Sequence, residues 1–253
     1  MFRTIILSAF GAGLVVGVAL SVVQAVTTEP LLFHAETFEN AEPAATGDAA
    51  TPYAHGDGQA HSHDAAPSAP AETAAAAAHE HDEDEWGPAD GFERSAYTFL
   101  ANLLVGVGAS AILLGLMTLR GGTINARTGV LWGVAGFFAA GLLPSLGLTP
   151  ELPGTPAAAL EARQIWWLAT VAASAVGIAL IVFSESWLLR IAGLVIGLMP
   201  HLVGAPVPPS LEAAYPAVMA AEFTSASLVV SALLWALSGI VGGWLYQRLS
   251  RTA

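Results

Sequence analysis

The stretch Ala96–Leu119, AYTFLANLLVGVGASAILLGLMTL, contains no charged residue. About 20 consecutive apolar residues suffice for a helix to cross the hydrocarbon core of a bilayer. Five further stretches have a similar length and apolar character: Ile5–Val26, Gly129–Leu148, Gln164–Phe183, Trp187–Ala205 and Phe223–Gln247. The sequence therefore predicts an all-α integral membrane protein, a bundle of about six transmembrane helices.

The composition supports this fold class and narrows the function. The chain has 253 residues, of which 55% are hydrophobic and 11% charged, which is too apolar for an ordinary globular domain. It has no cysteine, so disulfides and thiolate metal sites are excluded, and no lysine, so a phosphate-binding loop with its lysine is excluded. The sequence has no cluster of basic residues that could bind a nucleic acid, so we do not expect nucleic-acid binding. It also has no nucleophile and base at a spacing typical of a catalytic site, so we do not expect an enzyme.

The arginines indicate an orientation. If the N-terminus is cytoplasmic, Arg94 and Arg163 are the only two of the eight arginines that lie outside, in agreement with the positive-inside rule. We therefore expect a multi-pass protein with both termini in the cytoplasm. The first apolar run also permits a cleaved signal peptide, with a small-residue site at Val23-Gln24-Ala25, but its length favours a retained helix.

Three regions follow from this topology: a first transmembrane helix over residues 1–26, a periplasmic loop over 27–94 and a five-helix transmembrane bundle over 95–253. The loop contains six of the seven histidines and 15 of the 20 acidic residues. Its centre is rich in alanine, proline and glycine with little to bury, so we expect it to be disordered. Such an acidic face concentrates cations on one side of the membrane.

Two histidine pairs in the loop suggest metal binding. In His61-Ser-His63 and His79-Glu-His81, the imidazoles can chelate one divalent transition metal when the backbone is extended. Such nitrogen and oxygen ligands bind Ni²⁺, Cu²⁺ and Zn²⁺ as well as or better than Co²⁺, so selectivity is not expected. The alternative is a solvated, low-complexity loop without a metal.

Other candidate metal ligands lie near the ends of the spans. Those expected at the outer face are His34, Glu36, Glu39, Asp90, Glu93, Glu151 and Glu222. Glu36 and Glu39 are i, i+3 neighbours if the first helix continues outward, and they form either a metal entrance or simply a charged helix end. His201 is the single histidine within a predicted span. Pro200 before it predicts a kink, which suits a transport site or an interfacial histidine equally.

Several glycine pairs predict close helix contacts. Gly129-x-x-x-Gly133, Gly193-x-x-x-Gly197 and Gly239-x-x-x-Gly243 have the spacing of small-residue packing motifs. Such motifs are common by chance in glycine-rich spans, so they indicate contacts without identifying partners.

Ordered blocks of residues run along nearly the whole chain. They are Met1-Phe2-Arg3; Glu36 with Phe38-Glu39; the histidine-rich loop; Trp86-x-Pro88-x-Asp90-Gly91-x-Glu93-Arg94 with Tyr97 and Asn102; Leu131-Trp132-Gly133-x-Ala135-Gly136-Phe137; Pro150-Glu151-Leu152-Pro153-Gly154; Arg163-Gln164-x-Trp166-Trp167; and Pro200-His201-Leu202-Val203-Gly204-Ala205-Pro206. In this order the blocks resemble the CbtA family, the larger membrane subunit of a bacterial cobalt transporter.

This resemblance implies a function that the composition alone does not. It implies Co²⁺ uptake across the bacterial inner membrane in support of cobalamin synthesis, with Co²⁺ as the transported ion and no tightly bound cofactor. It also implies a small, single-span, CbtB-like partner subunit beside the lipid bilayer and the metal. The residues leave open a periplasmic metal-buffering or sensing protein, a nickel permease and a metal exporter.

Overall fold

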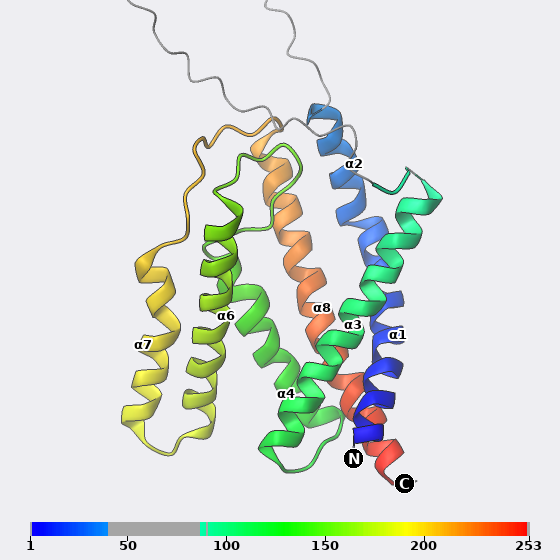
Figure 1. Ribbon diagram of the computed structural model, residues 1–253, viewed down its shortest axis with the longest axis vertical. Coiled ribbons are helices and arrows are strands. Elements are labelled where there is room, and N and C mark those ends of the chain that lie inside the picture. The colour runs from blue at the N-terminus through cyan, green and yellow to red at the C-terminus, as the bar shows by residue number, and fades with distance from the viewer. Residues whose placement is uncertain (1, 40–86, 90, 252–253) are drawn as a thin grey trace, which may run out of the picture.

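The computed structural model describes residues 2–39, 87–89 and 91–251. All regular secondary structure in these residues is helical, which confirms the predicted fold class (Figure 1). The elements are α1 (Phe2–Val26), α2 (Thr28–Glu39), α3 (Phe92–Arg120), α4 (Ala126–Gly136), the π-helix η1 (Phe137–Leu142), α5 (Leu143–Ser145), α6 (Leu160–Phe183), α7 (Trp187–Val203) and α8 (Ala217–Ser250).

Six helical segments run between the two ends of the bundle. By length and composition, five of them can cross a membrane: α1, α3, α6, α8 and the continuous segment Ala126–Ser145 formed by α4, η1 and α5. Helix α7 is also apolar but has 17 residues. It ends before the predicted Ala205 because Gly204 adopts a left-handed conformation, with φ of 89°.

The connections alternate between the two ends, as expected for a multi-pass protein. Both ends of the described chain, the α3–α4 connection and the α6–α7 turn lie at one end (Figure 1). Helix α2 and the connections 146–159 and 204–216 lie at the other, which we call the α2 end.

Pro30 explains why the first helix is interrupted. Proline has no N–H, so it cannot donate the helical hydrogen bond to the carbonyl of Val26, four residues earlier. Helix α1 ends at Val26, and the Thr27 hydroxyl donates to the Val23 carbonyl at 2.7 Å. Helix α2 then starts at Thr28 and runs to Glu39, so a helix occupies the beginning of the segment 27–94.

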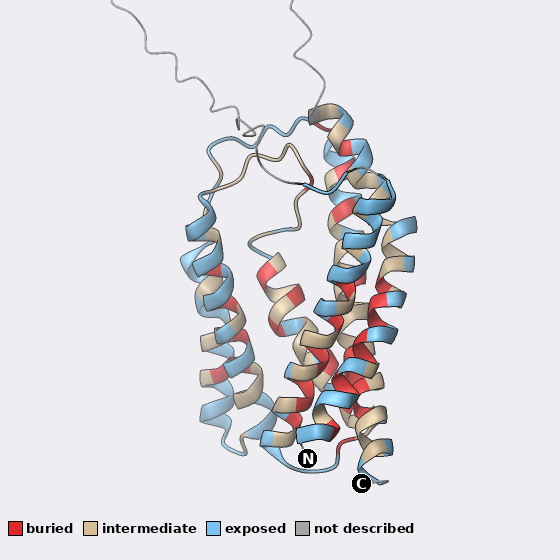
Figure 2. Ribbon diagram, turned by 45° about the vertical axis from the view of Figure 1, so that its right-hand side comes forward, coloured by how far each residue is buried: buried red, intermediate tan, exposed pale blue. Residues whose placement is uncertain are grey.

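The core lies where α1, α3, α4 and α8 pack together (Figure 2). Glycines allow the close approach: a Cβ on Gly13 would come within 2.6 Å of the Val107 backbone nitrogen. A Cβ on Gly129 in α4 would overlap the Gly239 carbonyl in α8, and the converse is also true. The predicted small-residue motifs in these two helices therefore mark a real contact.

Helices α6 and α7 form a peripheral hairpin. Helix α6 contacts α4, η1 and α5, whereas α7 packs, among the described helices, against α6 alone. Gly177 and Gly193 form the closest part of this contact, since a Cβ on either would lie 2.6–2.7 Å from the other's carbonyl oxygen. Gly197 has open space around its Cβ position, so only the first glycine of that predicted motif needs to be small.

Candidate functional site

An ion pair joins the two helices that flank residues 40–86. The Arg94 guanidinium, on the first turns of α3, contacts both carboxylate oxygens of Glu36 on α2, with Nη1 3.0 Å from Oε2. The guanidinium carbon also lies 4.9 Å from the centroid of the Phe33 ring. Both charged side chains are about 30% exposed. Glu36, predicted as a metal ligand, is therefore neutralised by arginine in this conformation.

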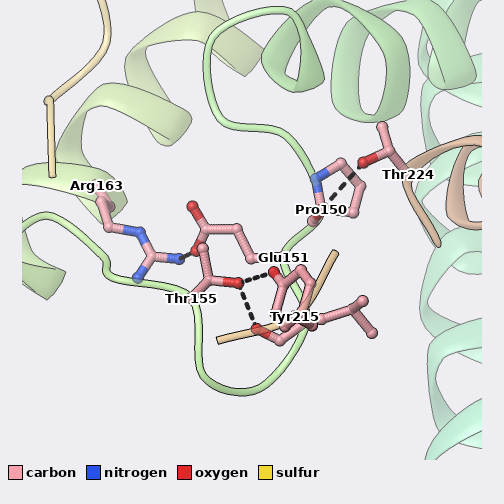
Figure 3. Close-up of polar contacts among 7 residues, drawn as sticks. Pro150, Glu151, Thr155, Arg163, Tyr215 and Thr224 are labelled. Atoms are coloured by element: carbon pink, nitrogen blue, oxygen red, sulfur yellow. Dashed lines mark hydrogen bonds and ion pairs between the residues drawn. The ribbon is translucent and has the colours of Figure 1, made fainter. Parts of the chain in front are cut away.

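A second ion pair organises the connection before α6. Arg163 Nη2 lies 3.0 Å from Oε2 of Glu151, another predicted ligand (Figure 3). In the same connection the Thr155 hydroxyl donates to the Leu152 carbonyl at 2.6 Å and contacts the Tyr215 hydroxyl. Thr224 on α8 donates to the Pro150 carbonyl at 3.3 Å. These contacts tie the α2 ends of α6 and α8 together.

His201 lies on the last turn of α7, beside Trp166 of α6. The two rings meet edge to face with centroids 5.8 Å apart, and Trp166 Nε1 donates to the Pro200 carbonyl at 3.2 Å. That carbonyl also accepts from the Gly204 N–H at 3.0 Å. The Nε2 atom of His201 is buried and has no hydrogen-bond partner in the described part of the chain. A buried nitrogen without a partner is an unusual feature that calls for an explanation.

A polar cavity of about 150 Å³ lies at the α2 end between α1, α2 and α3. It is lined by Gln24, Thr28, Glu29, Leu32, Phe33, Arg94, Ser95 and Thr98. Deeper in the bundle, the Asn102 amide donates to Ser21 Oγ at 3.0 Å and to Gln24 Oε1 at 2.6 Å. Polar groups thus extend from the ion pair of Glu36 and Arg94 into the α1–α3 contact.

A larger depression of about 390 Å³ lies at the opposite end, near the C-terminal turn of α8. Its lining includes Thr118, Tyr246, Gln247 and Arg251 but neither a carboxylate nor an imidazole. The depression therefore offers weaker metal ligands than the cavity at the α2 end, despite its greater volume.

The remaining predicted ligands do not converge. Glu93 is exposed and accepts from the Ala89 N–H at 3.3 Å, Glu222 is exposed on α8, and His34 is exposed with its ring 5.3 Å from that of Phe38. Glu39 ends α2. The residues His61, His63, His79, His81 and Asp90 lie outside the described residues. Within the described residues, no three His, Cys, Asp or Glu side chains are grouped to hold a metal ion.

Of the residues that line the polar cavity, the sequence patterns described above include only Arg94 and Gln24, and neither was predicted as a ligand. A usable signal was present in α3, where Arg94, Thr98, Asn102, Gly106 and Ser110 recur every four residues. Residues four apart are neighbours on a helix, and each step of four turns by about 40°, so the pattern indicates a polar or small-residue ridge that winds around an apolar span. Glu29 faces the same cavity from the first turn of α2.

The family comparison identifies the relatives of this chain. A family described as probable cobalt transporter subunit (CbtA) matches residues 2–247. The chain belongs to the CbtA family. Neither the curated proteins nor the solved structures gave a match. Membership makes the chain a cobalt transporter subunit, and the word subunit implies a partner. The apolar helices and the family together make it a multi-pass membrane protein.

Proposed function

We propose that this CbtA-family chain is the uptake subunit that captures Co²⁺ at the α2 end and passes it inward past His201. The match over residues 2–247 carries the proposal, because it runs from α1 into α8 and the matching family is described as a probable cobalt transporter subunit. The α2 end is periplasmic and both termini are cytoplasmic in this proposal. The protein lies in the bacterial inner membrane, and the imported metal supports cobalamin synthesis.

The charge distribution favours capture at the α2 end. Residues 27–94 carry 15 acidic residues and one arginine, and the remainder carries five acidic residues and seven arginines. A strongly acidic segment on one side of a membrane raises the local concentration of cations there. The loop histidines His61, His63, His79 and His81 add nitrogen ligands, which suit Co²⁺ better than carboxylates alone.

His201 is the best-placed ligand among the described residues for the next step. A neutral imidazole offers one nitrogen lone pair to a metal, and the unpartnered Nε2 would otherwise remain unsatisfied in a buried environment. The neighbouring Pro200 carbonyl already accepts two hydrogen bonds, so the imidazole is the freer ligand. Rotation of the ring away from Trp166 would expose Nε2 to an ion arriving along the α6–α7 hairpin.

The chain requires a second subunit in this proposal. A small, single-span, CbtB-like subunit is the partner that the family implies, and the described chain leaves most of α7 uncovered by other helices. Co²⁺ is the transported substrate. The protein itself is a transporter subunit and not an enzyme.

Reconstitution into vesicles with the small partner tests the proposal. Entry of radioactive Co²⁺ should exceed entry of Ni²⁺ and Zn²⁺. His201→Ala should raise the half-saturating Co²⁺ concentration at least about tenfold, as expected when a metal site loses a supporting group. Leu202→Ala is the matched control, because Leu202 is the next residue and 77% exposed. Unchanged affinity in His201→Ala would remove His201 from the path, and outward-only transport would overturn the uptake assignment.

A further inference from the structure

Glu29 is the one carboxylate among the residues that line the polar cavity at the α2 end. Its side chain is half-buried and makes neither a hydrogen bond nor an ion pair with the described part of the chain. Arg94 also lines the cavity, but its charge is balanced by Glu36. Glu29, Glu36 and Arg94 together carry a net charge of −1, which favours a cation over an anion beside Glu29.

Neutral oxygen atoms surround this carboxylate. Thr28, Thr98, Ser95 and Gln24 all line the cavity and supply hydroxyl or amide oxygens. Thr28 is the most buried of these residues, at only 7% exposed, and it lines the cavity directly. The Thr98 hydroxyl donates to the Arg94 carbonyl at 2.9 Å, which leaves its oxygen able to act as a ligand.

We propose that this cavity is a binding site for a partly hydrated divalent cation, with Glu29 as the charged ligand and Thr28 and Thr98 as neutral oxygen ligands. Carboxylate, hydroxyl and amide oxygens are ligands for hard divalent cations such as Mn²⁺ and Mg²⁺, and they also accept Co²⁺. The site differs from His201 and from the loop histidines in having oxygen ligands only.

The cavity has room for a divalent ion that keeps several of its waters, since one water needs about 10–15 Å³ of the roughly 150 Å³ that is open to water centres. Protein oxygens can replace the remaining waters of the ion. The Glu29 carboxylate is the strongest available replacement, so the site removes part of the hydration shell before the ion reaches the Asn102 amide and the α1–α3 contact.

The position of the site deepens the proposed function and rests on it for its place in transport. The cavity lies between α1, α2 and α3, and α2 and α3 flank residues 40–86, so in this proposal Glu29 receives an ion that the loop has captured. An oxygen-only site binds transition metals less tightly than imidazoles do, so an ion that reaches it can move on without being trapped there.

Binding of Mn²⁺ to the purified full-length chain tests the site without requiring transport. The probe is Mn²⁺ alone, measured by its electron paramagnetic resonance signal, because Mn²⁺ prefers oxygen ligands and binds imidazoles weakly. Glu29→Gln should remove one bound Mn²⁺ per chain or weaken its binding at least tenfold, and Thr98→Val should weaken it less. Glu185→Gln is the control, since Glu185 is exposed in the α6–α7 turn at the opposite end.

A second measurement places the ion in the cavity. The chain has no cysteine, so Ser95→Cys introduces a single thiol at the cavity lining. Mn²⁺ should slow the reaction of this thiol with a neutral reagent several-fold, and Glu29→Gln should abolish the effect. The proposal is wrong if Glu29→Gln and Glu185→Gln bind Mn²⁺ in the same number and with the same affinity. It is also wrong if Mn²⁺ does not change the rate at which the Ser95→Cys thiol reacts.

The two proposals fail separately. If Glu29→Gln loses the Mn²⁺ site but vesicles with the intact chain admit no Co²⁺, the site stands and the transport proposal fails. If Co²⁺ enters but Glu29→Gln binds Mn²⁺ like the intact chain, transport stands and the site fails. Thermal unfolding of Glu29→Gln, compared with the intact chain, confirms that a lost site reflects a lost ligand and not a lost fold.

Discussion

Replacing Gly193 with alanine should loosen the α6–α7 hairpin, whereas the same change at Gly197, one turn later on the same helix, should not. The Cβ of Gly193→Ala would lie 2.7 Å from the Gly177 carbonyl oxygen and 2.9 Å from Leu180 Cβ. Real Cβ atoms essentially never approach closer than 3.0 Å, so α6 and α7 must separate by a few tenths of an ångström. Gly197→Ala meets nothing within 4 Å.

The size of the effect follows from what α7 contacts. Because α7 packs against α6 alone among the described helices, other helix contacts cannot compensate for a wider α6–α7 spacing. When two packed surfaces separate by 0.5–1 Å, each atom pair loses about a quarter to a half of its dispersion energy. Overpacking typically costs about 1–3 kcal/mol of folding stability. Alanine regains about 0.5–1 kcal/mol of helix propensity at both positions. We therefore expect Gly193→Ala to destabilise by about 1–2 kcal/mol and Gly197→Ala to stabilise by up to about 1 kcal/mol.

Thermal unfolding of the purified protein in detergent measures the difference. With about 2–4 °C per kcal/mol for a chain of this size, Gly193→Ala should melt several degrees below the intact chain and Gly197→Ala slightly above it. Gly177→Ala combined with Gly193→Ala should cost less than the sum of the two changes, because both widen the same contact. Equal melting temperatures for Gly193→Ala and Gly197→Ala would refute the packing of this hairpin.

Two further predictions concern the α1–α3 contact and the loop. Asn102→Ala removes the amide that donates to Ser21 and Gln24 inside the α1–α3 contact. Thermal unfolding should show that the free energy of unfolding falls by about 1–3 kcal/mol. A decrease of less than about 0.5 kcal/mol would show that these hydrogen bonds contribute little to stability. Deletion of residues 43–81 should raise the half-saturating Co²⁺ concentration and leave the maximal rate of Co²⁺ entry unchanged. Loss of Co²⁺ entry even at saturating Co²⁺ would instead favour a metal-buffering protein.

The sequence was most informative about the spanning helices, since an apolar stretch of sufficient length needs no tertiary information to be recognised. Two helix boundaries are explained by single residues whose effect was not predicted. Pro30 accounts for the break after Val26, and Gly204 for the end of α7 before the predicted Ala205. The continuous span expected over 129–148 was less accurate. It contains the π-helix η1 and its last α-helical residue is Ser145, and a Cβ on Gly141 within η1 would lie 2.5 Å from the Ser231 hydroxyl of α8, a contact between helices that the sequence pattern does not show.

The site was harder to predict, because its residues meet through packing between helices. Glu36 and Arg94 are 58 positions apart, and their pairing depends on where α2, which packs against α1 and α8, lies relative to the start of α3. Glu29 was overlooked because a carboxylate in the first turn of a helix is ordinarily explained by the helix dipole alone. The loop histidines His61, His63, His79 and His81 remain a prediction, since they lie outside the described residues.

The contact between α1 and α8 has a consequence for how the protein is made. Helix α1 is synthesised before α8, yet α8 is one of its two main packing partners among the described helices. Val16 and Leu20 of α1 are buried together with Val230 of α8, so their shared surface cannot form before α8 has been synthesised. The α6–α7 hairpin, in contrast, pairs helices separated by three residues and can assemble as soon as it is inserted. We therefore expect the periphery of the bundle to form before its centre closes, and a chain that stops short of α8 to leave α1 without its final partner.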